Sequence, residues 1–373
     1  MKTFKIIILG SALIISNAQN LLSQTLDGKE SRKIQVTFAY PIGSAGTASR
    51  NYSNNLSLNV LYGLNGGVNG FEFGSLWNHN DGEVKWMQVA GLANTTNGNS
   101  QGLIISGIAN INSGSIVGAD ISGVLNYSHK YLSGVHIAGV ANIGLDSSKG
   151  ALVSGVLNFT KGSSKGFQVS TVNVANDLEG FQVGVLNFSK RLKGFQLGVI
   201  NIIKEDSEKA LPLGLISIVK DGFYEFDLTA GEAIYSNLNY KMGVERFYTI
   251  FKVGYSRYQE KPVYNYGWGI GTGIFLSDRQ RLNIEVSASQ ICYNYNWNPK
   301  HNGLNKLDLN YRFYILDNLS FLIGPSFNVY ITGESVNGKY GTINIPYTFY
   351  EHEYADKKLF SWIGFNAGIS IKL

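Results

Sequence analysis

Apolar and polar side chains alternate with a period of two along most of the chain, and between Gly70 and Ser217 this alternation is organised into a short repeat. Each unit ends in an asparagine, and the asparagines are 16 residues apart in the first half, then 15 and then 14. A period of two predicts strands, and a short fixed repeat indicates units that stabilise one another by stacking. The repeat asparagines are Asn78, Asn94, Asn110, Asn126, Asn142, Asn158, Asn173, Asn187 and Asn201.

The alternation assigns the apolar residues to different faces in different units. In the later units they share the parity of the asparagine, as Phe181, Val183 and Val185 do with Asn187. In the unit at residues 135–143 the apolar residues lie on the opposite parity, as in a strand that faces lipid.

Two architectures fit this region of tandem 14–16-residue β-repeats. In a β-solenoid each unit is one coil, and the repeat asparagines stack on one another. In the alternative, one large barrel, the units are successive antiparallel strands. We favour the solenoid because antiparallel neighbours point in opposite directions, so that one identical phrase would have to serve both ends of the sheet.

The regions around the repeats predict an exported protein with barrel strands. Residues 1–18 have the pattern of a signal peptide, with two lysines, a short apolar run and a small-residue cleavage site. Residues 33–66 predict N-terminal β-strands, 67–219 form the repeat region, and 220–373 predict a β-barrel-like region. We expect strands from both ends of the chain to form antiparallel outer-membrane-type barrel strands, with the first pairing to the last.

The C-terminal region contains longer alternating segments rich in Tyr and Phe. Eight strands are predicted, near residues 224–232, 234–242, 246–257, 266–276, 280–293, 304–316, 318–332 and 359–373. In the last segment Ile363, Phe365, Ile369 and Ile371 share one face with the final Leu373. One apolar and one polar face is the pattern of strands with lipid outside and a polar lumen inside.

Composition agrees with an all-β exported chain. Gly (44 residues), Phe (20) and Tyr (22) are abundant, whereas Met (3) and Pro (6) are few. Cys292 is the single cysteine, so an internal disulfide cannot form. The formal charge of +5 falls to +3 without Lys2 and Lys5, which is too small to indicate a nucleic-acid partner.

Taken together, these segments resemble a known family. The chain resembles bacterial surface-repeat proteins with an outer-membrane β-barrel-like C-terminal region. The segments that carry the resemblance are the opening strand at 36–43, repeat sequences such as Gly-Phe-Gln-Val-Gly-Val-Leu-Asn at 180–187, the closing unit at 213–220 and the barrel-like tail. The resemblance implies an outer-membrane or cell-surface address and a structural or adhesive role. It brings no catalytic residues.

Other candidate chemistry is weak. The glycines at 267, 269, 271 and 273 alternate within one strand and lack the strand-loop-helix context of a nucleotide site. The five histidines (79, 129, 136, 301 and 352) form no metal-ligand pair, and the polar cluster at 351–356 is interpreted as a solvated loop. We therefore expect no catalytic residue, cofactor or metal.

The sequence predicts a non-enzymatic outer-membrane or cell-surface protein of a Gram-negative bacterium, with a structural or surface-interaction role. Its expected partners are outer-membrane lipid and other envelope or surface proteins, with no nucleic acid. The alternative is an outer-membrane pore or transporter whose repeats form membrane strands.

Overall fold

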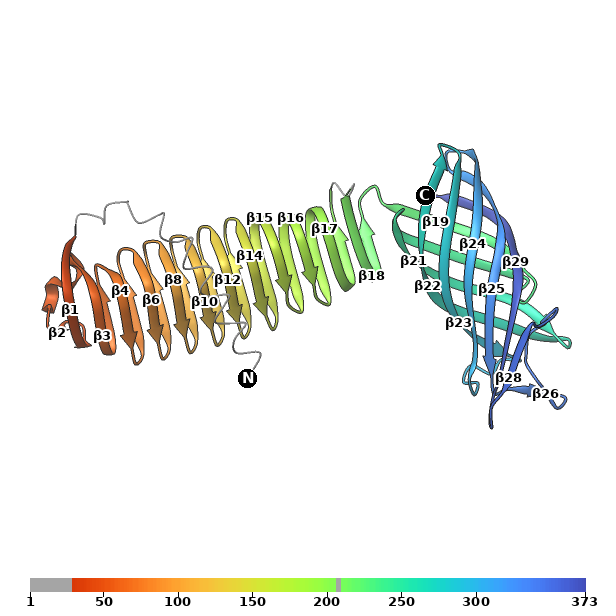
Figure 1. Ribbon diagram of the computed structural model, residues 1–373, viewed down its shortest axis with the longest axis horizontal. Helices are drawn as coiled ribbons and strands as arrows, with labels where there is room; N and C mark the ends of the chain where they lie inside the picture. Colours follow the sequence, from red (N-terminus) through yellow and green to blue (C-terminus); the bar gives the residue numbers. More distant parts are fainter. Residues whose placement is uncertain (1–28, 206–208) are drawn as a thin grey trace. The chain divides into compact units, whose positions relative to one another are not determined.

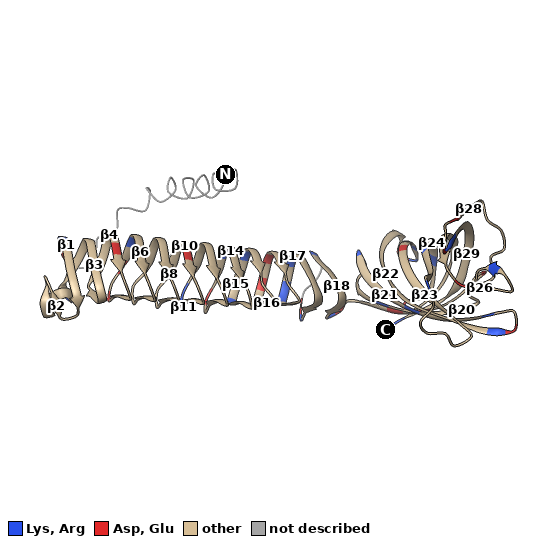
Figure 2. Cartoon of the chain, turned by 90° about the horizontal axis from the view of Figure 1, so that it is seen from below, with Lys and Arg blue, Asp and Glu red and all other residues tan. Residues whose placement is uncertain are grey.

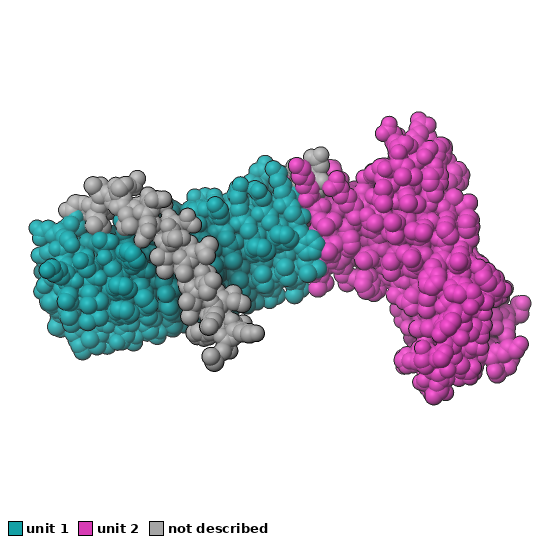
Figure 3. Space-filling view, viewed as in Figure 1, with its two compact units in different colours: residues 1–197 teal, residues 198–373 magenta. Residues whose placement is uncertain are grey.

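The computed structural model describes residues 29–205 and 209–373, and almost all regular structure in this part of the chain is strand. A β-solenoid of about ten turns is followed by a closed eight-stranded antiparallel barrel (Figure 1). The chain divides into two compact units, residues 1–197 and 198–373 (Figure 3). The all-β prediction is confirmed, and the predicted signal peptide lies outside the described residues.

Most solenoid coils consist of a long strand, a two-residue corner, a short strand and a second corner. The elements of this region are β1 (Glu30–Ala39), β2 (Ile42–Gly43), the 3-10 helix η2 (Gly46–Asn51), β3 (Tyr52–Asn65), β4 (Gly67–Gly74), β5 (Trp77–Asn80), β6 (Val84–Ala90), β7 (Ala93–Thr96), β8 (Ser100–Ser106), β9 (Ala109–Asn112), β10 (Ile116–Ser122), β11 (Leu125–Ser128), β12 (Leu132–Ala138), β13 (Ala141–Gly144), β14 (Ser148–Ser154), β15 (Leu157–Val169), β16 (Val172–Val183), β17 (Leu186–Ile203) and β18 (Lys209–Val219).

Successive coils pair in parallel and place equivalent residues side by side. Gly118 pairs with Gly134, and Asn126 pairs with Asn142, one repeat apart. The alternative in which the repeats are antiparallel strands of one large barrel is therefore wrong. Parallel stacking gives every unit the same environment, which is why one phrase serves the whole array.

The corner between the long and short strands explains the change of parity along the sequence. From Ile137 to Asn142 this step takes five residues, but from Val183 to Asn187 it takes four, although Ile137 and Val183 belong to one column. Ile137 and Val183 are 40% and 37% exposed, whereas both asparagines are buried. The expectation that Phe181 and Val183 share the face of Asn187 is wrong, because the corner interrupts the alternation.

Glycine is required at one column of the long strands, where the coils approach most closely. Gly118 has a φ of +136°, and a Cβ there would lie 2.0 Å from the carbonyl oxygen of Gly102. Trp86 takes this place in one coil, with a φ of 82°. The glycines of this column are Gly70, Gly102, Gly118, Gly134, Gly150, Gly166, Gly180 and Gly194.

The N-terminal strands belong to the solenoid, so the prediction that strands from both ends of the chain form the barrel is wrong. β1 pairs in parallel with β3, and β3 pairs in parallel with β4 and β5. The reason is that the inward-facing side chains of these strands are amides. Gln35 donates to Oδ1 of Asn65 (2.6 Å), and Asn54 donates to the same oxygen (3.0 Å). These buried amides continue the polar interior of the repeats.

The barrel closes within residues 223–372 through the antiparallel pairing of its first strand with its last. All eight strands correspond to segments predicted from the sequence. They are β19 (Phe223–Gly231), β20 (Ser236–Val244), β21 (Phe247–Tyr258), β22 (Lys261–Ser277), β23 (Gln280–Tyr293), β24 (Asn302–Leu316), β25 (Leu319–Thr332) and β29 (Lys358–Lys372). The long connection before β29 contains β26 (Ser335–Val336), β27 (Lys339–Tyr340) and β28 (Tyr350–Glu353).

The barrel has an apolar outer wall and a polar lumen, as the alternation predicted. Phe365 and Ile371 of the last strand are 53% and 47% exposed, while Asn366 and Ser370 between them are buried. The same arrangement holds along β24, where the apolar positions point outward and Asp308, among others, points inward.

We expect removal of one whole coil, residues 140–155, to preserve the fold. This 16-residue deletion joins equivalent positions, so each remaining residue keeps a partner in its own column. The free energy of unfolding should fall only by the contribution of one repeat and its interface with a neighbour. Removing residues 140–147 alone should unfold the coils around the cut, because no column continues across it. Circular dichroism melts of the two variants measure the difference, and equal damage from both would contradict the stacking.

Candidate functional site: the solenoid interior and the barrel lumen

The repeat asparagines form a buried ladder inside the solenoid. Asn126 donates from Nδ2 to Oδ1 of Asn142 (2.9 Å) and to the carbonyl oxygen of Ile137 (2.9 Å). Its own Oδ1 accepts from Asn110 (3.2 Å). Each amide thus satisfies the next amide and a backbone carbonyl near the corner, at a place where the strand ladder is interrupted. The donors and acceptors of the ladder are occupied internally, so its role is structural.

A second column of the interior contains a carboxyl group that the sequence analysis did not single out. Glu72 is fully buried and accepts hydrogen bonds from four amides: Asn65 (2.5 Å), Asn80 (2.6 Å), Gln88 (2.9 Å) and Asn59 (3.0 Å). Burial raises the pKa of Glu72 to about 7, and the four hydrogen bonds partly oppose that rise. The side chain is therefore an ionisable group in the middle of an amide network.

Asp120 and His136 occupy the same column as Glu72, three and four coils after it. Nδ1 of His136 lies 3.6 Å from Oδ2 of Asp120, and both side chains are buried. Asn110 donates to the other oxygen of Asp120 (2.6 Å), and burial raises the pKa of this carboxyl above its ordinary value. The repeat length could have predicted this contact from the sequence, because Asp120 and His136 stand 16 residues apart at equivalent positions of neighbouring coils.

The barrel lumen is filled by ion pairs between its strands. Lys241 contacts Asp227 (2.5 Å) and Glu285, and the hydroxyl of Tyr248 donates to Glu285 (2.7 Å). Arg312 pairs with Glu225 and with Asp227 (3.2 Å). Acids and bases therefore alternate around the lumen wall, which compensates the burial of each charge.

A second group of charges lies farther along the lumen. Asp308 is 3.6 Å from Lys306 and 3.8 Å from Lys252, and it accepts a hydrogen bond from Asn366 (2.7 Å). Lys306 in turn donates to Asn366 (2.8 Å). Together with the first group, these side chains occupy the cross-section of a barrel of only eight strands, whose interior is just wide enough for side chains.

The alternating glycines of β22 face this crowded lumen. A Cβ at Gly271 would lie 2.5 Å from the ring of Tyr248, and one at Gly273 would lie 1.9 Å from Nε of Arg281. The guanidinium of Arg281 stacks over Phe223, 4.4 Å from the ring centre. The glycine face therefore makes room for the large side chains of the neighbouring strands.

One end of the lumen is closed by an apolar cluster instead of charges. Its fully buried centre is Trp362, whose indole nitrogen donates to Glu232 (2.8 Å). The members of the cluster are Ala233, Ile234, Val263, Ile291, Leu304, Tyr330, Ile343, Phe360 and Trp362. Ion pairs at one level and apolar packing at the next leave the barrel interior filled.

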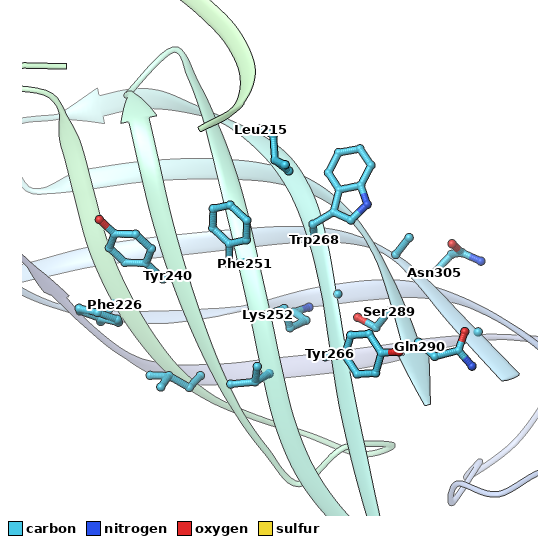
Figure 4. A pocket seen from close by; sticks show the side chains of 15 residues that line it. Leu215, Phe226, Tyr240, Phe251, Lys252, Tyr266, Trp268, Ser289, Gln290 and Asn305 are labelled. Carbon is cyan, nitrogen blue, oxygen red and sulfur yellow. The ribbon is translucent and has the colours of Figure 1, made fainter. Parts of the chain in front are cut away.

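A recess of about 740 Å³ lies on the second unit, mainly over the outer wall of the barrel (Figure 4). Outward-facing side chains of β19 to β22 line it, among them Phe226, Tyr240 and Trp268, and β18 contributes Leu215. The lining is mostly apolar, and Trp268 is 55% exposed. This surface suits an apolar ligand or lipid better than a reaction that needs acids and bases.

The other residues noted in the sequence lie apart from these networks. Glu351 pairs with Lys358 (2.7 Å), which lowers the pKa of Glu351, while His352 stacks on Tyr350 and meets Tyr354 edge-on. Cys292 is buried in the barrel wall. Within residues 29–205 and 209–373 no group of three or more potential metal ligands comes together.

We expect Asn126→Ala to destabilise the solenoid by roughly 2 to 3 kcal/mol, because it removes the amide donor to Oδ1 of Asn142 and to the carbonyl oxygen of Ile137. The matched control is Asn97→Ala, at an exposed corner, which should change stability by less than about 0.5 kcal/mol. Urea unfolding followed by circular dichroism measures both. A cost for Asn126→Ala no larger than that of the control would show that the ladder contributes little.

The raised pKa of Glu72 predicts that the solenoid loses stability as the pH rises. Between the ordinary pKa of 4.5 and about 7, the folded chain holds a proton that the unfolded chain has released. The contribution of protonated Glu72 to the free energy of unfolding is therefore fully present below about pH 4.5 and is lost as the pH rises through about 7. This contribution amounts to about 3 kcal/mol.

Urea midpoints at pH 5 and pH 8 measure this dependence. Glu72→Gln should flatten it, and Glu83→Gln, which changes a partly exposed acid at a neighbouring corner, should leave it unchanged. The same slope in wild type and in Glu72→Gln would exclude Glu72 as its source.

Comparison of the chain with protein-family models, with curated proteins and with solved structures finds no match. In the described residues no helix is long and apolar enough to cross a membrane.

Proposed function

We propose that this chain is a non-enzymatic outer-membrane protein, in which the barrel is the membrane anchor and the solenoid has a structural or surface-interaction role. The observation that carries the proposal is the inverted polarity of the barrel, with apolar side chains outside and paired charges inside. A bilayer requires about 9 to 11 residues per tilted strand, and the barrel strands have 9 to 17.

The connections at the two ends of the barrel support this assignment. At one end the strands are joined by the two-residue turns 245–246, 278–279 and 317–318. At the other end the connection 259–260 also has two residues, but the remaining three, 232–235, 294–301 and 333–357, are longer. Outer-membrane barrels have short periplasmic turns and longer extracellular loops.

Aromatic side chains gather near the end with the longer connections. Tyr264 stacks on Trp297 with ring centres 5.6 Å apart, and it also contacts Tyr255 and Tyr295. Such aromatic residues form the girdles that barrels place at the membrane interface. They add a second, independent feature of an outer-membrane barrel.

The proposal also assigns a side to the repeats. Phe223, the first residue of β19, pairs beside the short turn 245–246, so the chain enters the barrel at the end with the short turns. In an outer-membrane barrel that end faces the periplasm. We therefore propose a periplasmic side for the repeat array, instead of the cell-surface position that the family resemblance implies.

The packed lumen favours an anchor over a pore. Lys241, Asp227 and Glu285 form one layer of contacts, and the cluster around Trp362 closes another level. An open channel would need to break these contacts, and each buried ion pair is costly to separate.

We expect the native protein to fractionate with the outer membrane and to migrate faster on a detergent gel before boiling than after it, because a closed barrel resists detergent until heated. Val286→Arg, at the middle of the outer wall of β23, should reduce the inserted fraction, since a charge near the bilayer centre costs about 2 to 4 kcal/mol. Val286→Ala is the matched control and should insert normally.

Recovery as a soluble exported protein with no heat-dependent shift would overturn the anchor. Planar-bilayer recordings separate the two membrane functions: steady open currents from the wild type would favour a pore, and an absence of current with normal insertion would favour the anchor.

A further inference from the structure

The outer surface of the solenoid is apolar over about half of its circumference. Two outward columns of the long strands are apolar in nearly every coil, including Phe71 and Phe73 early in the array and Phe181 and Val183 late in it. Figure 2 shows how few residues on the solenoid strands are charged. Ordinarily such side chains would face the interior of a coil.

The corner between the long and short strands continues this apolar surface. One residue of each corner points outward at the same place in successive coils, and Thr171 is the polar exception. The exposed members of this corner column are Leu76, Leu92, Ile108, Val124, Val140, Val156 and Val185. They form a continuous apolar edge along the array.

The short strands extend the apolar surface around this edge, and the opposite corner limits it. Ile111, Ile143 and Phe159 occupy one outward column of the short strands. At the opposite corner the exposed residues are polar or charged, as with Asp146 and Lys161. The solenoid is therefore amphipathic in cross-section, with an apolar wedge and a polar edge.

The interior does not compensate for this exposure, because much of it is filled by the asparagine ladder and by Glu72, Asp120 and His136. Nine coils at about 4.8 Å per coil give the wedge a length of roughly 40 Å, and its two walls together measure roughly 26 Å around the corner. The apolar surface is thus on the order of 1,000 Å². Soluble monomers rarely expose a contiguous patch of more than a few hundred Å².

The depth of the wedge matches one lipid leaflet. Val135 stands five residues before the corner residue Val140, and Ile143 stands three residues after it, which corresponds to roughly 16 and 10 Å at about 3.3 Å per residue. The hydrocarbon of one leaflet is about 15 Å deep, half of the bilayer core. We propose that the solenoid lies lengthwise in one leaflet of a phospholipid membrane, with the corner column among the acyl chains and the polar corner in water.

Charged side chains at the limit of the wedge fit this position. Lys149 and Lys165 are exposed and pair in register just before the glycine column, and Glu179 and Lys193 take the equivalent places in the next two coils. Lys165 forms an ion pair with Glu179 (3.0 Å). The long side chains of Lys149 and Lys193 reach from this column to the level of lipid phosphates, while their stems cover the apolar wall. No comparable set of charges interrupts the wedge itself between residues 135 and 143, apart from the buried His136.

A lipid leaflet fits the wedge better than a second copy of the chain. A partner solenoid packed face to face would cover one wall and leave the corner column and the other wall in water. A fluid leaflet covers both walls and the corner at once. The proposal concerns the repeat array alone, so it goes beyond the barrel anchor and does not depend on it.

Site-directed spin labelling of the full-length protein tests the proposal. In a Cys292→Ala background, single cysteines replace Val140 at the corner column, Asp146 at the polar corner of the same coil, and Val286 on the barrel wall. The labelled proteins are reconstituted in palmitoyl-oleoyl-phosphatidylcholine vesicles, and collisions with oxygen and with a water-soluble nickel chelate are compared. The oxygen-to-nickel ratio at position 140 should exceed that at 146 several-fold and approach that at 286.

Each other outcome overturns a defined part of the argument. If the label at position 140 collides with nickel as freely as the label at 146, the solenoid does not lie in the leaflet. If the label at 286 is in lipid in the same experiment, the barrel is still a membrane anchor. Shielding of 140 from both reagents indicates a protein partner and also removes the wedge. A label at 286 exposed to nickel removes the anchor. A second corner variant, Val124→Cys, repeats the test if Val140→Cys does not fold.

Discussion

In-register stacking is the constraint from which the solenoid follows. Each residue lies one strand spacing from its equivalent in the next coil. The side chains that follow one another in a column must therefore be able to pack against or hydrogen-bond to one another. An amide meets this demand, since its nitrogen donates to the oxygen of the next amide, as from Asn126 to Asn142. A carboxylate cannot pair with a carboxylate, so Glu72 is surrounded by amides and Asp120 lies beside His136.

The barrel solves a related problem with complementary groups in place of identical ones. Its neighbouring strands run antiparallel and differ in sequence, so an acid on one strand meets a base on another, as Asp227 meets Lys241 and Arg312. The glycine face of β22 provides the volume that Tyr248 and Arg281 need. In both units polar side chains pair with one another inside and apolar side chains face outward, and in the solenoid this arrangement requires no closed lumen.

Local alternation was sufficient to predict the eight barrel strands and the stacked repeats, because both depend on period-two patterns and a visible repeat length. It could not reveal which face of a repeat points outward. That depends on the corner, where Asn142 follows Ile137 by five residues but Asn187 follows Val183 by four. The N-terminal strands were assigned to the wrong unit for a similar reason, since alternation does not state which edge a strand such as β1 will join.

The reversal of inside and outside changes what the hydrophobic pattern means for stability. Burial of Val84, Ile116 and Leu132 supplies some apolar core, but the surrounding columns of amides and hydroxyls hold the coils together mainly by hydrogen bonds. Such bonds gain strength where water is excluded. A lipid environment on the outer walls would exclude water from the strand edges and also cover the apolar wedge. The same surroundings would then stabilise both the ladder inside the coil and the apolar side chains of the wedge, while the polar corner stays in water.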